Sequence, residues 1–189
     1  MAVVGAGTMG NGIAQVFAQT NWKVTLIDVQ QSQLDKALQT IEKNVDRLIS
    51  KGSLPVEAKA KTLQNLHTST SIEKGVQEAS LVVEAATENQ AIKLAIFKEM
   101  DQFAPANCIL ASNTSSIPIQ LIAQATSRPE LVVGMHFMNP VPIMKLVEII
   151  KGPDTLASVA DTIVTLSKEL GKVPCVVNDF PGFISNRIL

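Results

Sequence analysis

The chain has 189 residues, of which 46% are hydrophobic, and its 16 Lys and Arg against 17 Asp and Glu give a formal net charge of −1. This length fits one sizeable domain or slightly more, with enough apolar residues for an ordinary buried core. The absence of a basic block or basic excess argues against a nucleic-acid or anionic-membrane surface. No apolar run reaches the roughly 18 residues of a membrane-spanning helix, so no membrane contact is expected.

Cys108 and Cys175 lie in apolar, strand-like runs, ANCIL and VPCVV. Two reduced core thiols are the favoured interpretation, and a disulfide or a metal pair is the less favoured alternative. No C-x-x-C pair or His/Cys cluster is present, so no metal site is expected. No signal peptide is visible and a bacterial cytoplasmic location is expected; because the chain begins almost inside a motif, a removed organellar targeting segment stays open.

Strand-like and helical segments alternate along the chain. The first residues predict a very short buried strand that enters a glycine turn, followed by a helix at 11–20 and a strand at 23–28. Apolar residues at helical spacing then predict a helix from an N-cap at Ser32 to about Ser50, with Gly52 as its stop, and a second helix at 56–66.

The remaining chain repeats the alternation. Strands are expected at 81–85, 108–112, 131–137, 145–150 and 172–178, and helices at 90–103, 118–125 and 155–170. Strands that alternate with helices predict an α/β fold, here a Rossmann-type, doubly wound and mostly parallel sheet with helices on both faces.

The turn after the first strand has the pattern G-x-G-x-x-G, with Gly5, Gly7 and Gly10. The three glycines permit the tight turn, the close approach of a pyrophosphate and the close packing of helix on sheet, and the phosphates of a dinucleotide would lie at the helix N-terminus. Asp28 ends the second strand and is placed to bond both hydroxyls of an adenosine ribose. Its charge would repel a 2′-phosphate and no arginine lies nearby, so NAD is favoured over NADP; the alternative is a glycine-rich helix N-terminus without a ligand.

His136 and Glu148 each lie inside an apolar run, 12 residues apart, with Pro142 midway between them. If the chain folds back at NPVP, the two side chains face each other. A carboxylate bonded to one imidazole nitrogen fixes the tautomer, and the other nitrogen can then accept a proton. The alternatives are a hydrogen-bonded core histidine and a glutamate on a solvated strand face.

Two polar loops follow predicted strands, ASNTSS at 111–116 and EAATEN at 84–89. Both are expected at the carboxyl edge of the sheet, where open α/β sheets bind ligands. The first loop also suits a turn and helix cap. Glu88 and Lys93, at the start of the next helix, also suit an N-terminal acid and a solvated lysine.

Taken together, GAGTMGNGIA, EAATEN, ASNTSS, GMHFMNPVPIMKLVEII and PGFISNRIL resemble the short-chain-length 3-hydroxyacyl-CoA dehydrogenase family over nearly the whole chain. The resemblance implies the NAD-dependent oxidation of (S)-3-hydroxyacyl-CoA, such as 3-hydroxybutyryl-CoA, to 3-oxoacyl-CoA, or the reverse reduction. His136 matches the family's catalytic base and Glu148 its partner.

The resemblance also implies further site residues. Ser115 and Asn186 would hold the substrate oxygen or thioester near the base, and Lys51 would contact a phosphate of CoA from a helical arm at about 32–66. The implied cofactor-binding residues are Gly5, Ala6, Gly7, Thr8, Met9, Gly10, Asp28, Glu88, Lys93, Ser115 and Asn139.

The family's organisation implies a NAD-binding domain at 1–180 and the beginning of a C-terminal helical domain at 181–189. That second domain helps to close the active site and carries much of the dimer contact in the family. A homodimer of a longer protein is therefore expected, with little or no activity in the isolated chain. The alternatives are a dehydrogenase that uses a catalytic lysine on a free acid, a non-catalytic relative of the crystallin kind, and the dehydrogenase part of a multifunctional β-oxidation enzyme.

Overall fold

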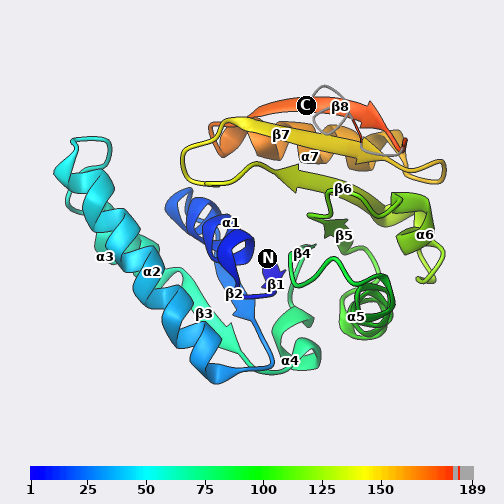
Figure 1. Ribbon diagram of the computed structural model, residues 1–189, viewed down its shortest axis with the longest axis horizontal. Helices are drawn as coiled ribbons and strands as arrows, with labels where there is room; N and C mark the ends of the chain where they lie inside the picture. The colour runs from blue at the N-terminus through cyan, green and yellow to red at the C-terminus, as the bar shows by residue number, and fades with distance from the viewer. Residues whose placement is uncertain (181–182, 184–189) are drawn as a thin grey trace.

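The computed structural model describes residues 1–180 and 183, which form one twisted sheet with helices on both faces (Figure 1). The eight strands lie in the order β3-β2-β1-β4-β5-β6-β7-β8. Neighbouring strands are parallel except β6 and β7, which are antiparallel. The strands are β1 Ala2–Val4, β2 Val24–Ile27, β3 Leu66–Ser69, β4 Leu81–Glu84, β5 Ile109–Ser112, β6 Val132–Phe137, β7 Leu146–Lys151 and β8 Val173–Asn178.

The helices cover the sheet in two groups. Side chains of α1, α2 and α7 pack with one face of the strands, and side chains of α4, α5 and α6 pack with the other. The helices are α1 Thr8–Gln19, α2 Gln31–Ser50, α3 Ala58–Gln64, α4 Ile72–Val76, α5 Gln90–Phe103, α6 Ile119–Ala123 and α7 Ala157–Glu169, with a 3-10 turn at Pro129–Leu131. Successive residues of β1, Val3 and Val4, belong to opposite cores, as the two-residue period of a strand requires.

The predicted fold is confirmed, and so are most of its elements. The arm expected at about 32–66 corresponds to α2 and α3, which lie side by side at the flank of the molecule (Figure 1). No helix in the described part of the chain is both long and apolar enough to cross a bilayer.

Three details of the prediction are wrong. Strand β3 and the short helix α4 were not expected, because β3 is an edge strand whose four residues are not fully buried and carry no apolar run. Ser32 is not the N-cap of α2; Gln30 is, without a side-chain hydrogen bond. The cause lies upstream, since Oδ1 of Asp28 accepts a hydrogen bond from the backbone N–H of Gln30 and turns the chain before Ser32.

The strand order creates the crevice that positions the site. The chain leaves β1 for β2 on one side, whereas β4 lies on the other side of β1. In open α/β sheets, a ligand binds at the carboxyl ends of the two strands where the order reverses in this way. Gly5, which follows β1, and Ala85, which follows β4, therefore mark the expected binding crevice.

Candidate active site

The glycine turn has the geometry that the motif predicts. Gly5 has φ +102°, and a Cβ built there would lie 2.6 Å from Cα of Ala86. A Cβ on Gly10 would lie 1.8 Å from the carbonyl oxygen of Gly5, so helix and turn touch at that point. A Cβ on Gly7 would meet no atom within 4 Å. Gly5 and Gly10 are thus required by the fold, whereas Gly7 leaves its backbone open to a ligand.

The N-terminus of α1 opens into a pocket of about 290 Å³. Gly7 is its N-cap and provides no side-chain cap, and the first intrahelical bond joins N–H of Asn11 to the carbonyl of Gly7. The N–H groups of the first turn can therefore bind an anion such as a pyrophosphate. The pocket is lined by Gly7, Thr8, Met9, Ala85, Ala86, Thr87, Glu88, Lys93 and Asn113.

Asp28 lies at the carboxyl end of β2, beside the turn. Its Oδ2 accepts a hydrogen bond of 2.9 Å from the N–H of Ala6, and its Oδ1 accepts one of 3.0 Å from the N–H of Gln30. The carboxylate is partly exposed, so it retains lone pairs for a further donor. The structure thus fixes Asp28 against the glycine turn, as a ribose-binding acid requires.

A buried ion pair lies at the floor of the pocket, and the sequence did not indicate it. Nζ of Lys93 contacts Oε2 of Glu84, and the two residues are 1% and 0% exposed. The same carboxylate accepts a hydrogen bond of 2.9 Å from Oγ of Ser112 and one of 2.9 Å from the N–H of Ala86. Lys93 is therefore not a solvated lysine, and Glu84 joins β4, β5 and α5 where the strand order reverses.

The two polar loops come together through Glu88. Its carboxylate accepts hydrogen bonds of 2.8 Å from Oγ1 of Thr114 and 2.9 Å from the N–H of Ser115. Oγ of Ser115 lies 3.4 Å from the same carboxylate. EAATEN and ASNTSS thus form one wall of the pocket, as their positions after β4 and β5 predicted.

His136 and Glu148 face each other across β6 and β7, where they are register partners. Nδ1 of His136 lies 2.8 Å from Oε2 of Glu148, and the two residues are 8% and 1% exposed. The ring of Phe183 lies beside the imidazole, with a centroid distance of 6.2 Å. The predicted pairing is confirmed, and the alternative of a glutamate on a solvated strand face is wrong because Glu148 is buried. A hydrogen-bonded core histidine has the same geometry, so the role of His136 as a base stays a prediction.

Asn113 connects the pocket to the strand of His136. Its Oδ1 accepts a hydrogen bond of 2.8 Å from the N–H of Phe137, and its own N–H donates to the carbonyl of Glu84 at 2.8 Å. Asn113 was not singled out by sequence reasoning, although it lies within ASNTSS.

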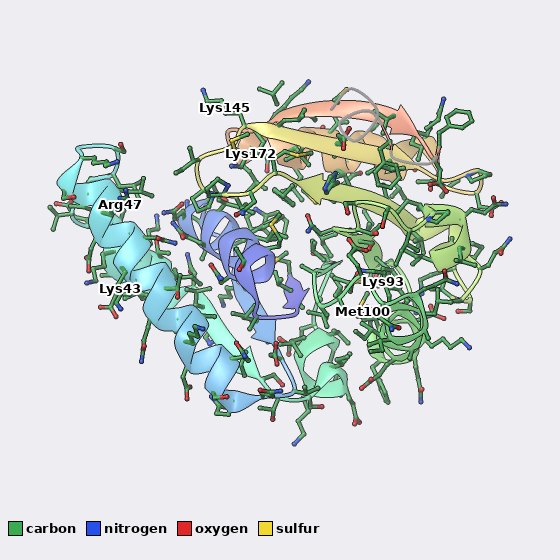
Figure 2. The ribbon with its side chains drawn as sticks, in the orientation of Figure 1. Lys43, Arg47, Lys93, Met100, Lys145 and Lys172 are labelled. Carbon is green, nitrogen blue, oxygen red and sulfur yellow. The ribbon has the colours of Figure 1, made fainter. Side chains whose placement is uncertain are left out.

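Two predicted site residues, Asn139 and Lys51, are not among the residues that line this pocket. Asn139 is exposed in the loop after β6. Asn186 lies outside the described residues. Lys51, the C-cap of α2, lines a second pocket of about 170 Å³, together with Asn44, Arg47, Leu48, Pro140, Pro142 and Ile143. Arg47 and Lys43 project from the arm, as Figure 2 shows.

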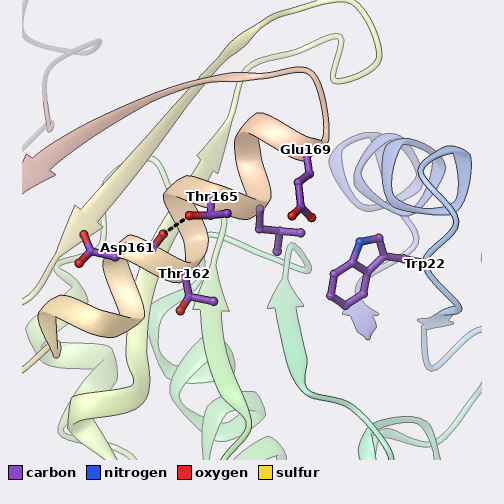
Figure 3. Close-up of a pocket in the computed structure, with 6 residues that line it drawn as sticks. Trp22, Asp161, Thr162, Thr165 and Glu169 are labelled. Carbon is purple, nitrogen blue, oxygen red and sulfur yellow. Dashed lines mark hydrogen bonds between the residues drawn. The ribbon is translucent and has the colours of Figure 1, made fainter.

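A third pocket, of about 430 Å³, lies between α7 and Trp22 (Figure 3). Asp161, Thr162, Thr165, Leu166 and Glu169 line its α7 side. Oγ1 of Thr165 donates to the carbonyl of Asp161 at 3.0 Å, so this hydroxyl is engaged within the helix. None of the predicted site residues lines this pocket.

The cysteines differ from one another. Both are free thiols; Cys108 is buried, but Cys175 is only partly buried on the edge strand β8. The prediction of two reduced thiols is confirmed; Cys108 lies within the core, whereas Cys175 is only partly buried and packs against it. Across residues 1–180 and 183, no three His, Cys, Asp or Glu side chains are grouped to hold a metal ion.

The fold, the glycine turn and the acid after β2 define a dinucleotide-binding domain with a histidine–glutamate pair at the ligand-binding edge. Residues 1–180 match the family described as 3-hydroxyacyl-CoA dehydrogenase, NAD binding domain. The chain belongs to this family, and the predicted family and cofactor, NAD, are confirmed.

Relatives match the chain over its whole length. A probable 3-hydroxybutyryl-CoA dehydrogenase of Deinococcus radiodurans is 48% identical over 99% of this chain and 66% of its own length. The crystal structure of (S)-3-hydroxybutyryl-CoA dehydrogenase from Ralstonia eutropha is 44% identical, with a TM-score of 0.96 over 99% of this chain and 66% of that one. The fatty acid oxidation complex subunit alpha of Psychrobacter cryohalolentis is 40% identical over 100% of this chain but only 26% of its own length. The chain thus spans about two thirds of the dehydrogenases and about a quarter of the multifunctional protein.

Proposed function

We propose that the polypeptide carrying this domain interconverts (S)-3-hydroxyacyl-CoA and 3-oxoacyl-CoA with NAD, and that its substrate is short, such as 3-hydroxybutyryl-CoA. The observation that carries this proposal is the buried pairing of His136 with Glu148, at 2.8 Å, on a domain whose relatives are named 3-hydroxybutyryl-CoA dehydrogenases. A buried carboxylate is costly unless it is paired, and its partner here is the residue type that exchanges a proton near neutral pH.

His136 acts as the general base. Because Glu148 accepts a hydrogen bond from Nδ1–H, the imidazole is held in the tautomer whose Nε2 has a free lone pair. Nε2 takes the proton of the 3-hydroxyl during oxidation and returns it during reduction. Glu148 stabilises the imidazolium that forms. When bound, NAD would accept the hydride that leaves C3 of the substrate, and NADH would return it in the reverse direction.

The glycine turn and its neighbours hold the cofactor. Gly5, Ala6, Gly7, Thr8, Met9 and Gly10 form the turn at the N-terminus of α1, where pyrophosphate is favoured. Asp28 binds the adenosine ribose and disfavours NADP. Glu88, Lys93, Ser115 and Asn139 are the other proposed cofactor contacts. Lys93 acts from the pocket floor, where its charge is balanced by Glu84.

The proposed substrate-binding residues lie in two parts of the structure, beside the glycine-turn pocket and in the pocket at the end of α2. Ser115 is hydrogen-bonded to Glu88, which lines the pocket, and its hydroxyl is proposed to contact a substrate oxygen. Lys51 lies beside Arg47 in the second pocket, and two cations next to the apolar Ile143 suit a phosphate joined to an organic chain. Asn186 is proposed from the resemblance alone.

The domain organisation is also a proposal. Residues 1–180 form the NAD-binding domain with its arm, and 181–189 begin a helical domain that closes the site and supports a homodimer. The isolated chain is then weakly active or inactive, and the protein works in the cytoplasm. The match to a fatty acid oxidation complex subunit supports a second candidate organisation, in which this domain is one part of a longer multifunctional chain.

The test compares substrates and cofactors on the full polypeptide. NADH oxidation is measured with acetoacetyl-CoA and with acetoacetate, and the first series is repeated with NADPH. We expect turnover of the CoA ester with NADH, little with NADPH, and none of the free acid. Preferential turnover of the free acid would contradict the proposed substrate. Full activity of the 189-residue chain would contradict the proposed role of the second domain.

A further inference from the structure

Asn113 extends the sheet beyond its regular ladder. The parallel pairing of β5 and β6 ends at Ser112 and Gly134, whereas β6 continues through His136 to Phe137. The N–H of Phe137 is met by Oδ1 of Asn113 at 2.8 Å instead of by a backbone carbonyl. This side chain therefore fixes the end of β6 next to His136 on the side away from β7.

The same bond determines which way the amide faces. A backbone N–H can only donate, so the amide oxygen must point to Phe137 and Nδ2 must point the other way. Asn113 lines the pocket at the glycine turn together with Gly7 and Lys93, and it is 8% exposed. Its backbone N–H is tied to the carbonyl of Glu84, so the residue has little freedom to turn. In the part of the chain that the structure describes, no hydrogen bond is donated by Nδ2.

The position between two functional groups indicates the ligand atom. The helix N-terminus at Gly7 suits the pyrophosphate of a dinucleotide, and His136 marks the reacting carbon. The part of the ligand between them is the second ribose followed by the nicotinamide, and the nicotinamide carries a carboxamide oxygen as an acceptor that ADP-ribose lacks. A donor held rigidly at this place is complementary to that oxygen.

We propose that Asn113 is a positioning residue with two bonds: Oδ1 holds the end of β6 that carries His136, and Nδ2 donates to the carboxamide oxygen of the nicotinamide. The inference rests on the proposed NAD-dependent activity and deepens it. One amide would then fix the position of the nicotinamide ring relative to the imidazole of His136. A turn-forming asparagine would need only the first bond.

The decisive variant is Asn113→Asp in the full polypeptide, measured at pH 8. The aspartate keeps an acceptor for Phe137 but replaces the donor by a second, charged acceptor. We measure Kd for NADH and for ADP-ribose, which has the pyrophosphate but no nicotinamide. Asn178→Asp, at the exposed end of β8 three strands away, is the matched control for the added charge.

We expect Asn113→Asp to weaken NADH binding by about tenfold or more, the loss of one well-made hydrogen bond, with ADP-ribose binding within about twofold of the wild type. Unchanged NADH binding would overturn the proposal, and so would equal losses for both ligands. If the wild type binds neither ligand, the proposed function fails, and the role of Nδ2 fails with it; a failure of the Asn113 proposal alone is seen only when the wild type binds both ligands.

The first bond is tested with Asn113→Leu, which has neither acceptor nor donor. At saturating NADH its kcat for acetoacetyl-CoA is expected to fall further than that of Asn113→Asp, because the end of β6 is released. Equal kcat values would overturn the role of Oδ1. If the leucine variant does not fold while the aspartate variant does, the acceptor is shown to be required for holding β6.

Discussion

Oε2 of Glu148 lies 2.8 Å from Nδ1 of His136, and the two residues are direct partners in the one antiparallel pair among the strands that the structure describes. A parallel pair would require a long crossover, whereas an antiparallel pair needs only a short loop. Residues 12 apart in sequence thereby face each other at the edge where the ligand binds. The reversal at 138–145 is thus the feature of the fold that pairs the proposed base with its carboxylate.

Glu148→Gln tests the carboxylate. The amide fills the same space but neither stabilises an imidazolium nor enforces the tautomer, so kcat for acetoacetyl-CoA reduction is expected to fall about 10²- to 10⁴-fold. NADH binding should stay unchanged. Glu130→Gln, an exposed glutamate outside the site, is the matched control. A loss of less than about fivefold in Glu148→Gln would show that the carboxylate only packs the strand.

Glu84→Gln tests the buried ion pair. It leaves the ammonium of Lys93, 1% exposed, without its charge partner, so the free energy of unfolding is expected to fall by about 3–5 kcal/mol. Urea unfolding measures this. Adding Lys93→Met removes the unpaired charge and should restore most of the loss. If Glu84→Gln alone costs under about 1 kcal/mol, the pair contributes nothing to folding.

The stability of the fold in acid should depend on Asp101. Burial tends to raise its pKa, but hydrogen bonds from the N–H of Ser127 and from Arg128, at 2.6 Å, outweigh this and hold the pKa below its usual value. Because the folded pKa lies below the unfolded one, the stabilisation is present above the unfolded pKa and is lost as the pH falls through the folded value. Urea midpoints between pH 7 and pH 3 should therefore drop less steeply in Asp101→Asn. Parallel curves for the two proteins would rule out this contribution.

The two thiols should react at different rates. Burial raises the pKa of Cys108 to about 11, so its thiolate is scarce at pH 8, whereas Cys175 is partly exposed on β8. A thiol reagent is expected to modify one cysteine in the native chain and two in denaturant. Cys175→Ser should abolish the native reaction. Rapid native labelling of Cys175→Ser would contradict the burial of Cys108.

Much of the site was predictable, because its chemistry follows short motifs on predicted strands. The glycine turn, Asp28 and the pairing of His136 with Glu148 needed only strand ends and one chain reversal. The partnership of Glu84 with Lys93 did not follow, since LVVE reads as a strand that ends in an acid. Only the stacking of β4, β5 and α5 shows that this acid is buried. Asn113 escaped notice for a related reason, because its role depends on where the β5–β6 ladder stops.

The measurement that tests the account most directly is NADH oxidation by acetoacetyl-CoA, with the full polypeptide and its His136→Gln variant side by side. Loss of the general base predicts a fall in kcat of about 10²- to 10⁴-fold, with NADH binding and thermal unfolding as in the wild type. Turnover by His136→Gln within about threefold of the wild type would contradict the assignment of His136 as the base.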